Sequence, residues 1–426
     1  MRTRRINTMM TGLAALLMAG CSQNEVTEVS PDAHPQVGFS VYTGVPTRGV
    51  EVSTESMKAD PTVADAYGGF GIMGYFTGQK SFEEAKGTAT PSFMHNQMVK
   101  WDATANSGSG AWVYSPVKYW PNQPGDKISF FAYAPYEQDW ENGTKTGVVV
   151  SAATQQGIPY IDFTLKDKDN LTKMVDLVVA DKRDMTYTPE NGGKVSFNFE
   201  HTLSRVSFQA KLGDGLFNDM DGTKSFVYIT HMWIVGTNHT APNSNLSLLD
   251  PAAVVNSGSK FYTKAKWSEL HWNYTDATIA AADFSLDNIL NFDNGITESN
   301  PTTGHAGIIK GIKIDKSSQS KPVSLFPDKQ FLYLIPIADD TESGKMSGCA
   351  KGDIKFGFHY DIVTQDQTTS GQYVASHAEA VIEIPAGHMK RKESYLYTLK
   401  INLREITIEA AEVKAWDKVP SEVVIQ

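Results

Sequence analysis

Hydrophobic and polar residues alternate along most of the chain. In the stretch VGFSVYTGV, residues 37–45, every second position forms one face, and that face carries Val37, Phe39, Val41 and Val45. Such a two-residue period is typical of a β-strand that is buried on one side. The pattern therefore predicts a half-buried strand over residues 37–46.

Comparable strand-like stretches recur to the end of the chain. They cover residues 70–76, 112–120, 127–136, 174–180, 194–212, 226–236, 330–337, 353–363, 380–387 and 394–413. No amphipathic helix pattern exceeds about ten residues. Short strands separated by Gly- and Pro-containing turns predict an all-β protein built from β-sandwiches.

Composition changes at two places suggest how these strands are grouped. Residues 181–193 are polar and end in Asn-Gly-Gly, which predicts a boundary between one sandwich over 37–188 and another over 189–426. Residues 240–325 are rich in Asn, Ser, Thr and Asp. We expect long surface loops with a few helical turns in this region.

The N-terminus predicts export. Basic residues open the chain, and the apolar run at 9–20 is too short to span a bilayer, so residues 1–20 are expected to be a signal peptide. The sequence LLMAG before Cys21 resembles the lipobox of bacterial lipoproteins, although Met18 stands where Leu is usual. We therefore expect a lipid on Cys21 and a flexible tether over residues 21–36. The alternative is ordinary signal cleavage, with Cys21 incidental.

Charge and cysteine content narrow the function classes. The formal net charge is −10, and no basic stripe is visible, which argues against nucleic-acid binding. The chain has two cysteines, Cys21 and Cys349. If Cys21 is acylated, no intramolecular disulfide can form.

The motifs that could carry chemistry are weak. GFGIMG at 69–74 fits the dinucleotide pattern G-x-G-x-x-G, but no helix pattern follows, so a strand with glycines is favoured. The acidic runs 167–170 and 218–222 lack an EF-hand ligand, since Thr230 stands at the twelfth position counted from Asp219. Binding of a calcium ion at the surface remains an alternative. His201, within a strand pattern, is expected to be structural.

Catalytic patterns are also missing. The sequence contains no H-E-x-x-H and no G-x-S-x-G motif. Carboxylates distant along the chain could still pair for glycoside hydrolysis, and eight tryptophans could line a sugar site, but Trp120 and Trp416 adjoin strands and are expected in the core. We expect no catalytic residues, no cofactor and no metal.

Several stretches together resemble the fimbrillin family, the pilins of type V pili. They are FGIMGYF, YSPVKYWPNQPGDKISFFAYAP, VDLVVAD, FNFEHTLSRVSF, LYLIPI, AGHMKRKESYLYTLKI and EVKAW. With the lipobox, they follow the family's order over most of residues 21–416.

The resemblance implies a fold and a route of assembly. The fold would be two tandem transthyretin-like, Greek-key β-sandwiches. The precursor would reach the outer membrane as a lipoprotein, where an arginine-specific protease would cut between Arg48 and Gly49. Residues 37–48 would then be a removable segment, and its vacated groove would accept a strand from another pilin subunit, placing the mature protein in cell-surface fimbriae.

The other end of the chain offers a donor strand for such an exchange. In residues 417–426, Val419, Val423 and Ile425 lie on one face of an extended segment. The alternative is a frayed terminus. We expect a fimbrial subunit or adhesin that is not an enzyme. The alternatives are a non-polymerising surface lipoprotein that binds a glycan or host ligand, and an extracellular hydrolase.

Overall fold

The computed structural model describes residues 35–43, 52–63, 66–166, 168, 170–171, 173–214, 220–239, 259–293, 295–300, 307–328, 330–338, 346–402 and 406–416. Within these ranges the chain is mostly β-strand, and α1 (Phe82–Ala85) is the one α-helix. Short 3₁₀ turns lie at Ser56–Lys58, Asn106–Gly108, Pro189–Asn191, Asp287–Ile289 and Lys316–Gln319. The expected β-rich fold without long helices is confirmed.

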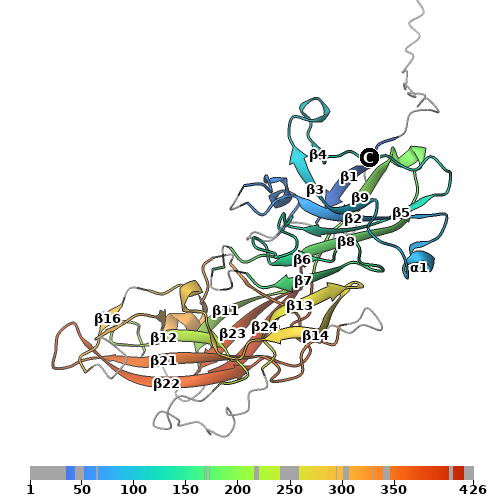
Figure 1. The fold of residues 1–426 in the computed structure, drawn as a ribbon. Helices are drawn as coiled ribbons and strands as arrows, with labels where there is room; N and C mark the ends of the chain where they lie inside the picture. The colour runs from blue at the N-terminus through green and yellow to red at the C-terminus, as the bar shows by residue number, and fades with distance from the viewer. Residues whose placement is uncertain are drawn as a thin grey trace, which may run out of the picture.

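An antiparallel six-stranded sheet organises the N-terminal half (Figure 1). Its strands, in spatial order, are β10 (Glu200–His201), β8 (Val178–Met185), β5 (Lys127–Ala134), β2 (Phe70–Gly78), β3 (Met94–Asp102) and β4 (Ala111–Val113). A separate pair, β1 (Gly38–Tyr42) and β9 (Lys194–Asn198), packs against one face of this sheet through shared core residues.

Both faces of the six-stranded sheet are covered, which explains why its central strands are apolar throughout. Phe130 of β5 belongs to the core under β1, and the next residue, Phe131, belongs to the core on the opposite face. The glycines of GFGIMG serve this packing, because a Cβ on Gly71 would lie 2.3 Å from the ring of Tyr133. The preference for a strand over a dinucleotide loop is confirmed by β2.

A four-stranded sheet joins the two halves of the chain (Figure 1). Its order is β14 (His271–Ile279), β13 (Tyr262–Ser268), β7 (Tyr160–Thr164) and β6 (Val148–Val150). Trp267 and Trp272 of the β13–β14 hairpin are buried, and Trp272 lies 6.1 Å from Phe163 of β7 between ring centroids. The expectation of loops and helical turns over 240–325 is wrong for this hairpin.

Two further sheets pack face to face in the C-terminal half. One contains β19 (Val323–Ser324), β11 (Ser204–Leu212), β23 (Glu393–Ile401) and β24 (Ile406–Ala415), with β20 (Leu332–Leu334) also on β11. The other contains β15 (Phe284–Ser285), β12 (Ser225–Ile234), β21 (Lys355–Gln365) and β22 (Tyr373–Glu383), with β18 (Ile312–Ile314) also on β12. A small pair, β16 (Ile296–Thr297) and β17 (Ile308–Ile309), completes the described strands. Phe208 and Phe356 meet between the two sheets, 4.8 Å apart.

The stretch 194–212, expected to be one strand, is divided into β9, β10 and β11, which belong to three different sheets. Thr202 separates β10 from β11, and its backbone and hydroxyl both bond the carbonyl of Leu177. The boundary expected between residues 188 and 189 stays a prediction. Strands on either side of it pair with one another, β9 with β1 and β10 with β8.

Candidate functional site: the first strand and the groove beneath it

β1 is an edge strand that runs parallel to its partner. Gly38 lies opposite Lys194, and the register continues without a shift to Tyr42 opposite Asn198. The Gly38 amide donates to the Gly193 carbonyl at 2.9 Å, and the Phe199 amide donates to the Tyr42 carbonyl at 2.8 Å. Among the strands that the structure describes, β9 is the one that pairs with β1. On its other edge, no described strand forms a ladder with β1, although an isolated antiparallel bridge joins Gln36 to Tyr119 just before the strand begins.

The inward face of β1 is seated on an aromatic core. Val37 and Phe39 are 1% and 6% exposed, which confirms the inward face predicted for both, and Val41 is half-buried. Val45 lies outside the described residues. The Phe39 ring meets four other rings at centroid distances between 5.3 and 6.3 Å. These rings belong to Phe70, Tyr114, Phe130 and Phe197.

Polar contacts hold the two ends of the strand. The Tyr114 hydroxyl donates to the Val37 carbonyl at 2.7 Å, and burial raises the pKa of Tyr114, so the phenol stays a donor at neutral pH. At the other end, the Thr43 hydroxyl accepts from the Thr54 amide at 2.6 Å and contacts the Thr54 hydroxyl at 3.1 Å. Thr43 is 5% exposed and Thr54 is half-buried, so this polar pair lies at the border of the buried face.

The chain beyond residue 51 is anchored independently of β1. The Val52 amide donates to Asp176 Oδ2 at 3.0 Å, and Val52 is 5% exposed. Met57 is fully buried, and its carbonyl accepts from the Gly69 amide at 2.7 Å. Thr54 bonds Thr43, but Val52 and Met57 are held by Asp176 and Gly69, which lie just before β8 and β2.

Asp176 also fixes His201. The carboxylate accepts from His201 Nδ1 at 2.8 Å, and the imidazole stacks on Trp416 with centroids 4.0 Å apart. Both side chains are buried, as expected for a structural histidine. Trp120 and Trp416 are 2% and 3% exposed, so the prediction that they lie in the core is confirmed.

Comparison with known proteins identifies the family. The chain is 31% identical to the fimbrium subunit Fim1C of Phocaeicola vulgatus over 414 residues, which cover 95% of each chain. It belongs to the fimbrillin-like family. The fimbrillin-like sequence model matches residues 59–268. A fimbrial protein crystal structure from Bacteroides vulgatus is 26% identical and superposes with a TM-score of 0.68, covering 90% of this chain and 99% of that one.

These similarities confirm the resemblance inferred from sequence. Because the fimbrillin-like family is one of structural fimbrial proteins, the expectation that the chain is not an enzyme is also confirmed. The β-rich architecture agrees with that of the fimbrial protein structure.

The residues predicted for lipidation, proteolytic processing and strand donation are not among those that the structure describes. Cys21, Arg48 and Gly49 lie outside the described residues, as do Val419, Val423 and Ile425. Their roles stay predictions.

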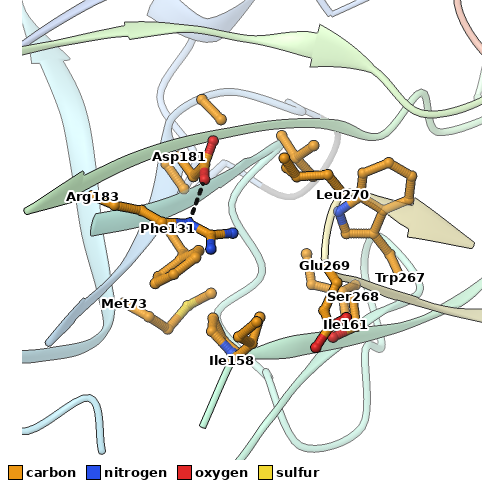
Figure 2. Close-up of a pocket in the computed structure, with 14 residues that line it drawn as sticks. Met73, Phe131, Ile158, Ile161, Asp181, Arg183, Trp267, Ser268, Glu269 and Leu270 are labelled. Carbon is orange, nitrogen blue, oxygen red and sulfur yellow. Dashed lines mark hydrogen bonds and ion pairs between the residues drawn. The ribbon is translucent and has the colours of Figure 1, made fainter. Parts of the chain in front are cut away.

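A small cavity of about 40 Å³ lies where the tip of the β13–β14 hairpin meets the six-stranded sheet (Figure 2). Phe131, Met73 and Trp267 line its apolar wall. Arg183 Nε donates to Asp181 Oδ2 at 2.9 Å, and its guanidinium lies 5.3 Å from the Phe131 ring centroid. The space holds about one water molecule, so we interpret it as a packing gap between sheets rather than a sugar site.

Two observations on the described residues concern metal ligands and membrane-spanning helices. The described residues contain no group of three His, Cys, Asp or Glu side chains placed to hold a metal ion. Asp221 caps a turn, and hydrogen bonds from Lys224 and Thr223 lower its pKa to about 2. None of the described helices has the length and apolar character needed to cross a bilayer.

Sequence reasoning missed the residues that form the groove. Phe70, Tyr114, Phe130 and Phe197 come from four separate segments, and nothing in the alternation indicates that they converge on Phe39. Asp176 offered a local signal. An acidic residue inside the apolar run MVDLVVA requires a buried hydrogen-bond partner.

Proposed function

We propose that this protein is a fimbrium subunit that assembles by strand exchange. Lipid on Cys21 would hold the precursor at the outer membrane, and an arginine-specific protease would cut between Arg48 and Gly49. Loss of residues 37–48 would open the groove to a strand from another pilin subunit. The mature protein would then reside in cell-surface fimbriae. The fimbrium subunit Fim1C, similar over nearly the whole chain, supports this proposal.

The observation that carries the proposal is the seating of β1. It is a short edge strand with one ladder and a buried aromatic face. Two fully buried apolar side chains, Val37 and Phe39, contribute roughly 3–6 kcal/mol before ordering costs. Loss of β1 would expose this apolar surface together with the free edge of β9, and such an edge is a template for strand addition.

The contacts on either side of residues 44–51 support the proposal that the N-terminal piece leaves and the remainder stays folded. Residues before this segment attach through β1, through backbone bonds to residues 118–120 and through the bond between Thr43 and Thr54. Val52 and Met57 instead bond Asp176 and Gly69. A cut after Arg48 would therefore free the N-terminal piece while the rest of the fold remains. The donor strand that we propose contains Val419, Val423 and Ile425, which follow Trp416 at the end of β24.

The mature N-terminus tests the cut. We expect mass spectrometry of the protein from cells to find Gly49 as the first residue, and Arg48→Ala to keep the N-terminal piece attached. Lys58→Ala is the matched control, since Lys58 is a basic side chain beyond the site that makes an exposed ion pair with Glu55. A mature N-terminus upstream of β1 in the wild-type protein would contradict the proposal.

Assembly is tested separately, by sizing the protein before and after digestion with an Arg-specific protease in the presence of other fimbrial subunits. We expect larger assemblies after the cut and none with Arg48→Ala. Equal assembly by Arg48→Ala would contradict strand exchange. A clean cut after which the subunit joins no assembly would favour the non-polymerising surface lipoprotein instead.

A further inference from the structure

In the groove beneath β1, the position of Phe39 restricts the type of side chain that fits more than the other inward positions do. We propose that it selects an incoming strand with an aromatic side chain at the position of Phe39, and that this strand comes from a different subunit rather than from a second copy of this chain. The inference rests on the strand-exchange function proposed above and names the partner of the same site.

The walls of the Phe39 position fit a flat ring. Phe70 and Phe130 approach the Phe39 ring at interplanar angles of 85° and 83°, and Phe197 stacks on it at 21°. Edge-to-face and stacked contacts of this kind are specific to aromatic pairs. An aliphatic side chain would leave part of the space between the rings unfilled.

The walls are also held in place. Phe70 and Phe130 are fully buried in neighbouring strands of the six-stranded sheet, and Phe197 is 1% exposed in β9. Because β2 and β5 have ladders on both edges, the Phe70 and Phe130 rings cannot move far to close a gap. A strand without an aromatic residue here would leave a cavity, and cavities weaken packing in proportion to their volume.

A second requirement lies four residues further along the strand. The buried Thr43 hydroxyl accepts from the Thr54 amide at 2.6 Å. A strand with an apolar residue at this position would leave the half-buried Thr54 N–H without that acceptor, and a donor that loses its acceptor away from free solvent is costly. The groove therefore favours an apolar residue at the first inward position, an aromatic at the second and a hydroxyl at the fourth.

The last ten residues of this chain do not meet these requirements. The segment DKVPSEVVIQ contains no aromatic residue. The registers that keep Val419, Val423 and Ile425 on the inward face all put a non-aromatic residue at the position of Phe39. That residue is Asp417, Val419, Ser421, Val423 or Ile425. Placing Val419 at the first inward position also puts Pro420 where the Gly38 amide donates to Gly193, and proline has no N–H. We therefore infer that this segment does not fill the groove of its own kind of chain, and it remains the proposed donor to another kind of subunit.

The test measures peptide uptake by the cut chain. A site-specific protease sequence is inserted between residues 48 and 49 of a chain that starts at residue 22, so the cut does not depend on Arg48. After the cut, labelled peptides compete for the groove, and fluorescence anisotropy reports binding. The probes are residues 35–43, the same peptide with Phe39→Ala, the same peptide with Thr43→Val, and residues 417–426.

We expect the 35–43 peptide to bind, the Phe39→Ala peptide to bind at least about tenfold more weakly, and the Thr43→Val peptide to lie between them. The 417–426 peptide should bind no better than the Phe39→Ala peptide, and the cut chain alone should remain monomeric. Equal binding of the 35–43 and Phe39→Ala peptides, tight binding of 417–426, or polymers of the cut chain alone would overturn the inference and leave strand exchange standing. Failure of every peptide to bind would overturn strand exchange itself.

Discussion

β1–β9 and β11–β23 are the two parallel ladders among the described strands, and they are built into the molecule in different ways. β11 and β23 lie inside their sheet, because β19 and β20 occupy the other edge of β11 and β24 occupies the other edge of β23. β1 has a partner on one edge. Neither β11 nor β23 can leave without breaking two ladders, whereas β1 can leave by breaking one. The same type of pairing therefore lies within a sheet in β11–β23, which we call the permanent ladder, and at an edge in β1–β9, where we propose that the strand is replaced.

The largest expected loss of stability follows from a substitution in the permanent ladder, β11–β23. Phe208 of β11 is fully buried and stacks on Tyr397 of β23 at 5.4 Å. Phe208→Ala should lower the free energy of unfolding by about 3–5 kcal/mol, and the loss should be the same before and after the cut at residue 48. Urea unfolding followed by near-UV circular dichroism measures it. A loss that differs between the two forms would show that the two ladders are coupled.

The matching change in β1 should depend on the cut. Phe39→Ala should lower the unfolding free energy of the uncut chain by about 3 kcal/mol, because it removes a ring packed among four others. After cleavage and removal of residues 35–48 the variant and the wild type are identical, so the difference should vanish. An effect below about 0.5 kcal/mol in the uncut chain would contradict the buried seating of Phe39.

Lowering the pH should decrease the stability of the protein near the permanent ladder, because His388, which bonds Tyr397 of β23, becomes protonated. Its Nδ1 is hydrogen-bonded to the Tyr397 hydroxyl at 3.0 Å, and burial lowers the pKa of His388 below its ordinary 6.5, although nearby Glu393 opposes the shift. The folded state thus binds fewer protons than the unfolded chain. This stability is present above pH 6.5 and is lost as pH falls through the lowered pKa. The ring is partly exposed, so the loss should be modest.

Unfolding midpoints measured against pH test this contribution. We expect a smaller decline below pH 6.5 in His388→Gln than in the wild type. His271→Gln is the control, since His271 is partly exposed on the β13–β14 hairpin and bonds a backbone carbonyl. The same decline in His388→Gln and the wild type would show that His388 is not responsible.

The smallest effect concerns the outward face of β1. The hydroxyls of Ser40 and Ser196 lie 2.8 Å apart on the exposed side of the β1–β9 pair. Ser40→Ala should change the unfolding free energy by less than about 0.5 kcal/mol, because water can replace the lost partner. A larger loss in calorimetry would mean that the outward face, and not the aromatic groove, retains β1.

The parts of the fold that local pattern determines were predictable. The alternation at Val37 and Phe39 gave the correct inward face, and the strand-like stretch 127–136 contains β5. The partner of β1 was not predictable, because β9 lies more than 150 residues away and the choice depends on which edge the tertiary fold leaves open. The aromatic walls of the groove follow from that choice.

The β13–β14 hairpin shows a different kind of failure. Its turn residues, Glu269 and Leu270, have φ angles of 54° and 66°, a conformation that usually requires Gly or Asn. Without that signal, the polar residues around them read as a loop. The buried pair Trp267 and Trp272 is what holds the turn, and the packing of two rings across a hairpin is not visible in the local composition.

The division of residues 194–212 among three sheets has a mechanical consequence. In a fimbrium, a neighbouring subunit's strand paired with β9 would transmit any pulling force to β9. The backbone of β9 continues through β10 into β11, which lies in a sheet of the C-terminal half. Tension would thus pass through covalent bonds and enter β11 between ladders on both of its edges. Because a parallel strand pulled along its axis loads its hydrogen bonds in shear, all of them would resist together. We expect the subunit to yield first at the exchanged strand.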